Sequence, residues 1–220
     1  MTKAKLTLGQ AESIAMQAEA LIVHDGRRDF RLTCERILAA GSIRRRCESV
    51  GDVELVAIPR IVEQAESPVG QASLPTIGAN HGQGRPRHQH SAPRHQTENL
   101  LLKRLDELLE DGRIAKAFKT DGRPRWGEKY RAFTLPEHPD VHVELFLANA
   151  RNWGVILAIR TGSADFSQEL VTRIKQRGEY RVQKGHLTRV ADGEIVDCPD
   201  EETMFKAAGY DRVLPPEERT

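Results

Sequence analysis

One short run constrains the fold of this chain more than any other: residues 52–58 read Asp-Val-Glu-Leu-Val-Ala-Ile, and a proline follows. A run of this length, rich in branched aliphatic residues and ended by proline, predicts a β-strand. Side chains alternate between the two faces of a strand, so Asp52 and Glu54 project from the same face. The valine and leucine that follow them point into the core. The sequence therefore predicts a sheet that carries two carboxylates on one patch.

Two neighbouring carboxylates repel each other unless a cation lies between them. Carboxylate oxygens are hard ligands that suit Mg²⁺ or Mn²⁺, so Asp52 and Glu54 are candidate metal ligands. Glu144, a lone acid within the apolar run 141–147, is the best candidate for a third ligand of a two-metal site. The alternatives are that Asp52 and Glu54 lie on a solvated strand edge, and that Glu144 is an acid at the edge of the core that pairs with one of the many arginines.

The segment just upstream favours the metal interpretation. Gly41 permits close backbone approach, and Ser42 offers a hydroxyl and an amide. Arginines at positions 44–46, Arg45 among them, supply planar donors that match phosphate oxygens. A phosphate-binding loop beside a metal site is therefore expected.

The rest of the chain mixes helical and strand patterns, which indicates an α/β or α+β protein. Apolar spacing and turn residues predict helices at 8–23, 28–33, 98–110 and 166–177 and from about 201, and strands at 36–40, 114–119, 130–135, 141–147 and 153–159. Residues 61–97 are rich in Gly, Pro, His, Gln and Arg, and we expect a long mobile insertion there.

Charge and cysteine content narrow the class of protein. Lys and Arg number 33 against 32 acidic residues, so the protein has almost no net charge. Any basic surface that binds nucleic acid must therefore be a local patch. Three cysteines without paired spacing suit a reducing compartment. No stretch approaches the ~20 apolar residues of a membrane helix. We expect a monomer without a membrane partner, in the cytoplasm, at a nucleoid or a viral replication site.

The motifs together resemble a known family. Gly41-Ser42, Arg45, Gly51-Asp52-Val53-Glu54, the later Glu144 and Thr161-Gly162-Ser163 are similar to the nucleotidyltransferase palm of X-family DNA polymerases, the polymerase beta-like group. The C-terminal runs 184–187, 192–196, 200–205 and 216–219 resemble the thumb of that family. The resemblance covers most of the chain outside the insertion.

The resemblance implies a palm with a mixed β-sheet and flanking helices, plus a small α+β thumb. Residues 1–40 would form N-terminal helices that resemble reduced fingers, 41–160 the palm with its insertion at about 61–97, and 161–220 the thumb. It also implies a DNA polymerase that transfers a deoxynucleotide from a dNTP to a primer 3′-hydroxyl with release of pyrophosphate. Primer-template or gapped DNA would be the partner, and short-gap filling in repair the task.

Site residues are implied position by position. Asp52, Glu54 and Glu144 would hold two divalent ions, Mg²⁺ or Mn²⁺. The triphosphate would contact Gly41, Ser42, Arg45 and Gly51, and the nucleotide sugar would lie by Gly162 and Ser163. The basic residues Arg173, Lys175, Arg181 and Lys184 would follow a phosphate backbone, an ordinary solvated face being the alternative.

Two departures from the family keep other functions open. The family usually has aspartate at all three metal positions, whereas positions 54 and 144 are glutamate. An aromatic pair often precedes the Thr-Gly-Ser motif, but this chain has Ile159-Arg160, which leaves sugar selection open. The alternatives are template-independent nucleotidyl transfer to a nucleic-acid end or another acceptor, and a catalytically degenerate DNA-binding module.

Overall fold

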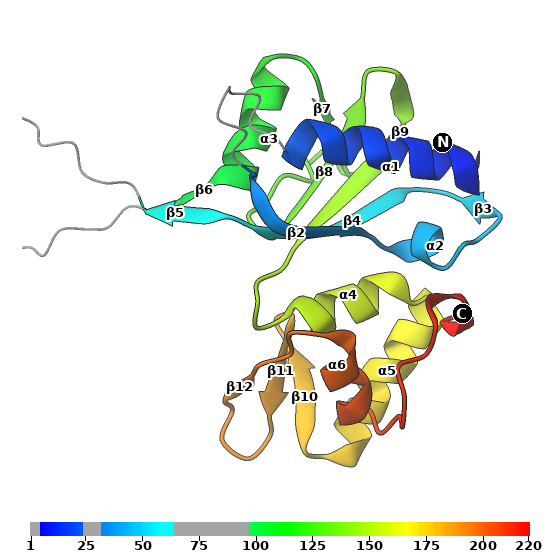
Figure 1. Cartoon of the computed structure of the whole chain (residues 1–220), viewed down its shortest axis with the longest axis vertical. Coiled ribbons are helices and arrows are strands. Elements are labelled where there is room, and N and C mark those ends of the chain that lie inside the picture. The colour runs from blue at the N-terminus through cyan, green and yellow to red at the C-terminus, as the bar shows by residue number, and fades with distance from the viewer. Residues whose placement is uncertain (1–4, 24–31, 64–96) are drawn as a thin grey trace, which may run out of the picture.

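The computed structural model describes residues 5–23, 32–63 and 97–220, arranged as two lobes (Figure 1). Residues 28–31 of the predicted second helix and 64–96 of the predicted insertion lie outside the described residues. The chain on either side of the latter gap pairs as two antiparallel strands, β5 (Ile61–Glu63) and β6 (Thr97–Asn99).

A five-stranded mixed sheet forms the frame of the N-terminal lobe. Its order is β2 (Cys34–Ala39), β4 (Val53–Pro59), β9 (His138–Leu147), β8 (Tyr130–Leu135) and β7 (Ala115–Lys116). Strands β4 and β9 run parallel, and the other neighbours run antiparallel. The sequence prediction of a mixed sheet with flanking helices is confirmed.

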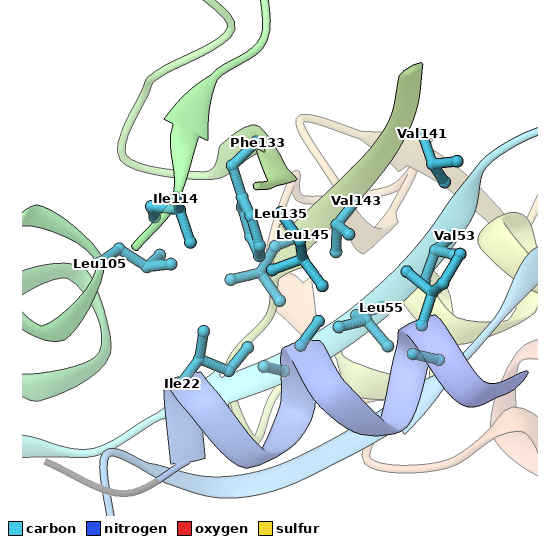
Figure 2. Packing of buried hydrophobic residues seen from close by; sticks show 14 of the residues in the cluster. Ile22, Val53, Leu55, Leu105, Ile114, Phe133, Leu135, Val141, Val143 and Leu145 are labelled. Atoms are coloured by element: carbon cyan, nitrogen blue, oxygen red, sulfur yellow. The ribbon is translucent and has the colours of Figure 1, made fainter. Parts of the chain in front are cut away.

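Two helices, α1 (Leu8–Val23) and α3 (Leu100–Glu110), pack on one face of this sheet (Figure 2). Helix α1 begins at a reciprocal cap, because Gln10 N donates to Thr7 Oγ1 and Thr7 N donates to Gln10 Oε1. Asn99 caps α3 by accepting from Leu102 N at 3.0 Å. The short strands β1 (Leu6–Thr7) and β3 (Ser49–Val50) pair beside α1. The shared core includes Ile14, Ile22, Val53, Leu55, Leu105, Phe133, Val143 and Leu145.

The C-terminal lobe combines helices with a small sheet. It contains α4 (Trp153–Thr161), α5 (Ala164–Arg177), α6 (Glu201–Ala207), the antiparallel strands β10 (Tyr180–Gln183), β11 (His186–Arg189) and β12 (Ile195–Val196), and the 3₁₀ turn η1 (Pro216–Glu218). Its core includes Val155, Ala158, Leu170, Leu187, Met204 and Phe205. No helix in the described ranges is long and apolar enough to span a membrane.

The predicted strand at 153–159 is wrong, because this segment is helix α4. Trp153 and Leu157 pack on the sheet of the N-terminal lobe, whereas Val155 and Ala158 pack into the C-terminal core. A helix buried on opposite sides is apolar all round, and a short apolar run of this kind cannot be told from a strand by periodicity. Position 154 is glycine because a Cβ there would overlap the backbone of Asp200.

Candidate functional site

Parallel pairing of β4 with β9 places two of the predicted acids side by side. Glu54 and Glu144 are directly paired Cα positions in this ladder. Their neighbours Val53 and Val143 are fully buried in the core under α1, so both glutamates project from the opposite face. Asp52 lies in the bend immediately before β4, and not within the strand as predicted. The three acids are therefore neighbours where β4 begins, with Glu144 beside them within β9.

Burial and mutual repulsion both disfavour negative charge in this cluster of acids. The pKa of Glu54 is raised to about 7, by burial first, then by the charge of Glu144 and to a smaller extent by that of Asp52. Arg160 and Arg45 act in the opposite direction. An uncompensated carboxylate in such a place is costly, so the cluster favours a cation or a proton.

Glu144 has a cation beside it. Its Oε1 accepts a 2.6 Å hydrogen bond from Nη1 of Arg125, and its side chain is 15% exposed. The same Nη1 lies 3.3 Å from the hydroxyl of Tyr130, whose pKa is raised to about 12 by burial and by Glu144. Arg125 thus partly neutralises the acids from the segment before β8.

No ready-made group of three or more His, Cys, Asp or Glu side chains with metal-binding geometry is found among residues 5–23, 32–63 and 97–220. The Glu144 carboxylate is turned to Arg125, and the Glu54 carboxylate lies against Gly41. Three hard oxygen donors with excess negative charge nevertheless have the chemistry that a divalent ion requires.

The predicted phosphate loop packs directly on this cluster. Helix α2 (Gly41–Arg44) follows β2, and Gly41 has a φ of +58°. A Cβ at this position would overlap Oε2 of Glu54, so only glycine allows the approach. Ala40 N also donates to Glu54 O at 2.8 Å. Ser42 Oγ accepts from Nη2 of Arg45 at 3.3 Å, on the same loop.

The loop arginines reach towards the C-terminal lobe. Arg45 Nη1 donates to the carbonyl of Thr161 at 2.6 Å, and Arg44 Nη1 donates to the Thr161 hydroxyl at 2.6 Å. Arg44 also forms an ion pair with Glu201 of α6. The adjacent Arg46 is exposed instead. Gly51 lies in the bend with Asp52 and is therefore adjacent to the acids in the chain.

Glu201 also forms an ion pair with a second arginine, which lies in the C-terminal tail. Arg219, only 1% exposed, pairs with Glu201 and donates to the carbonyl of Leu214 at 2.7 and 2.9 Å. Burial works to raise the pKa of Glu201, but hydrogen bonds from Arg44 and Arg219 hold it below its usual value. This Arg44–Glu201–Arg219 network links the predicted phosphate loop, α6 and the tail.

Gly162 and Ser163 form the junction between α4 and α5. Ser163 Oγ accepts from Phe166 N at 3.1 Å and caps α5, and Ser163 N donates to Arg219 O at 2.9 Å. A Cβ at Gly162 would crowd the ring of Phe166. Both residues therefore have structural roles at a junction that follows Thr161, the partner of the loop arginines.

The four basic candidates of the C-terminal lobe differ in their surroundings. Arg173 stacks on Tyr210, with 4.3 Å from its guanidinium carbon to the ring centroid. Lys175 and Arg181 are exposed. Lys184, with a φ of +53°, lines a cavity between the lobes.

That cavity has a volume of about 690 Å³ and extends from Glu144 to the β10–β11 turn. Sequence reasoning missed most of its functional groups. Arg125 precedes Glu144 by 19 positions, and no local motif signals their contact. In the sequence, Arg160 stands out only because it occupies a position where the X-family often has an aromatic residue. Further lining side chains are Lys129, Tyr130, Phe146, Asn152 and His186.

Comparison with known families identifies the C-terminal region. Residues 156–220 match the family model of the DNA polymerase beta thumb. A comparison with curated proteins finds no match. The matched region contains the α4–α5 junction, the small sheet, α6 and the tail with Arg219. This C-terminal region is thus similar to the thumb of an X-family polymerase, which indicates a polymerase-related, DNA-binding function.

Proposed function

We propose that this protein is a compact DNA polymerase of the X-family type. It transfers a deoxynucleotide from a dNTP to the 3′-hydroxyl of a primer, releases pyrophosphate, and fills short gaps. The observation that carries this proposal is the direct pairing of Glu54 with Glu144 next to Asp52, on a lobe joined to a polymerase beta-like thumb.

The acids Asp52, Glu54 and Glu144 would hold two divalent ions, Mg²⁺ or Mn²⁺. Such ions, when bound, lower the pKa of a hydroxyl nucleophile and offset the charge of phosphate oxygens. The raised pKa of Glu54 supports this assignment, because a cation between the acids would relieve the repulsion that raises it. Arg125 would release Glu144 when the site is loaded.

The chain's own residues would bind and orient the reactants. Ser42 and Arg45 would hold the triphosphate beside Gly41, and the Gly162–Ser163 junction would lie by the sugar. Arg45 already donates to Thr161, so the loop and the junction are held in one place before substrate binds. Most of the rate enhancement would come from this positioning and from charge compensation.

Primer extension tests the proposal. Single-nucleotide-gapped, recessed and single-stranded DNA are incubated with each dNTP or rNTP in Mg²⁺ or Mn²⁺, using wild type and Asp52→Asn. We expect templated extension that falls by roughly 10²–10³-fold or more in the variant. Asp121→Asn is the matched control, because Asp121 lies in an exposed turn, where it forms an ion pair with Arg123.

The same assay separates the alternatives. Addition without a template would identify a terminal transferase. DNA binding that weakens steeply with salt, without incorporation under any condition, would leave a degenerate DNA-binding module and contradict the polymerase proposal.

A further inference from the structure

The guanidinium of Arg160 lies in the wall of the cavity between the lobes, where it contacts an aromatic ring. It lies in the last turn of α4, with its guanidinium carbon 3.8 Å from the centroid of the Phe146 ring. Phe146 in turn lies 4.9 Å, centroid to centroid, from Tyr130. The face of the guanidinium is therefore fixed by an aromatic pair.

The N–H groups at the edge of the same guanidinium donate to no acceptor within the described part of the chain. Arg131, Arg173 and Arg219 also stack on rings, and each donates hydrogen bonds to protein acceptors. Arg160 makes no hydrogen bond or ion pair with any described residue, so up to five N–H donors remain for a ligand. An arginine fixed by its face and open at its edge loses little freedom when it binds an anion.

The charge of the cavity favours an anion. Lys129 and Lys184 line it from the two lobes, together with Arg160, and the nearby Glu144 is already paired with Arg125. Glu128 is the other acid in the lining. Arg160 is also near enough to the acidic cluster to act on Glu54 electrostatically. A phosphate there would lie beside the reacting groups.

We propose that Arg160 binds a phosphate oxyanion of the substrate, with its face on Phe146 and its N–H edge towards the oxygens. This inference rests on the proposed function and deepens it. The oxyanion belongs either to the triphosphate of the incoming nucleotide or to a phosphodiester of the DNA. The chemistry is the same in both cases, and the experiment distinguishes the two sources.

The test compares full-length wild type with Arg160→Met, Arg160→Lys and Arg36→Met. Arg36 is the matched control, because it stacks on Trp153 at 4.4 Å but does not line the cavity. Binding of gapped DNA is measured by fluorescence anisotropy over a range of salt concentrations, and KM and kcat for a dNTP are measured on the same DNA. Thermal unfolding shows that each variant is folded.

A phosphodiester contact predicts that Arg160→Met weakens DNA binding by about tenfold or more and lowers the slope of log Kd against log salt by about 1. A triphosphate contact predicts a similar rise in KM for the dNTP with an unchanged salt slope. Arg160→Lys keeps the charge but loses the planar fork, so its loss is intermediate in either case. Arg36→Met behaves like wild type.

Unchanged DNA affinity, salt slope and KM in a folded Arg160→Met variant, beside an active wild type, contradict this inference alone. A wild type that binds neither gapped DNA nor a dNTP contradicts the proposed function as well.

Discussion

Arg44 and Glu201 connect the two lobes through a two-pronged contact. Nη1 and Nη2 of Arg44 donate to the two carboxylate oxygens of Glu201 at 2.9 and 2.7 Å, and the Glu201 side chain is 10% exposed. Arg44 belongs to the predicted phosphate loop, whereas Glu201 starts a helix within the thumb-like region. The position of the loop therefore depends on a contact made 157 residues later in the chain.

Glu201→Gln is expected to destabilise the protein by about 3 kcal/mol at pH 7, because it leaves the buried Arg219 and the partly buried Arg44 without their shared counter-charge. Chemical denaturation measures the change in the free energy of unfolding. Glu202→Gln is the matched control, since Glu202 lies on the same helix in an exposed i,i+4 pair with Lys206. Equal losses in the two variants would show that the network contributes no more than a surface pair.

The carboxylate of Glu201 also makes the stability of the protein depend on pH. Its pKa in the folded protein is held below the ordinary value of 4.5, so its stabilising effect is complete above pH 4.5 and is lost as the pH falls through the folded pKa. Unfolding measured between pH 6 and pH 3 is expected to show this loss in wild type. The difference between wild type and Glu201→Gln shrinks over the same range, and a constant difference would contradict the assignment.

Glu54 predicts the opposite dependence. Its pKa rises from 4.5 in the unfolded chain to about 7 in the folded protein, so the folded state binds the proton more tightly. The contribution of this group to stability therefore falls as the pH rises from 4.5 to about 7, by about 3 kcal/mol in total. In EDTA, Glu54→Gln is expected to be more stable than wild type at pH 8. A less stable variant at that pH would contradict the raised pKa.

Gly41→Ala tests the contact between the predicted phosphate loop and the carboxylate of Glu54. Alanine at a φ of +58° is strained, and its Cβ would also displace the Glu54 carboxylate. We expect a loss of about 1–3 kcal/mol together with loss of nucleotide transfer. Gly112→Ala is the control, because Gly112 has a φ of +67° but open space around a Cβ. Full activity in Gly41→Ala would show that the loop need not touch Glu54.

Arg125→Gln tests whether Glu144 is a metal ligand. Arg125 competes with a cation for Oε1 of Glu144, so its removal is expected to tighten Mn²⁺ binding several-fold, as measured by calorimetry. Arg123→Gln is the matched control, two residues away, with a side chain that is 74% exposed and paired with Asp121. Weaker Mn²⁺ binding in Arg125→Gln than in the control would remove Glu144 from the predicted ligand set.

Local patterns in the sequence predicted those elements that have one apolar face. The predicted helices at 8–23 and 98–110, which are α1 and α3, and the predicted strand at 130–135, which is β8, are confirmed. Helix α4 was mistaken for a strand, because it is buried between two lobes and shows no polar face from which a period could be read. Local patterns thus predict an element best where it separates core from solvent.

For the candidate site too, the sequence determined some features and the tertiary structure decided others. The sequence alone determined the residue types: acids at positions 52, 54 and 144, a Gly-Ser loop, and a C-terminal region that matches a polymerase beta thumb. Only the tertiary structure decided that Glu54 and Glu144 are paired neighbours, that Arg125 neutralises one of them, and that the arginines of the loop bind the other lobe. These contacts join residues far apart in the chain. They depend on strand order and lobe packing, which no local pattern encodes.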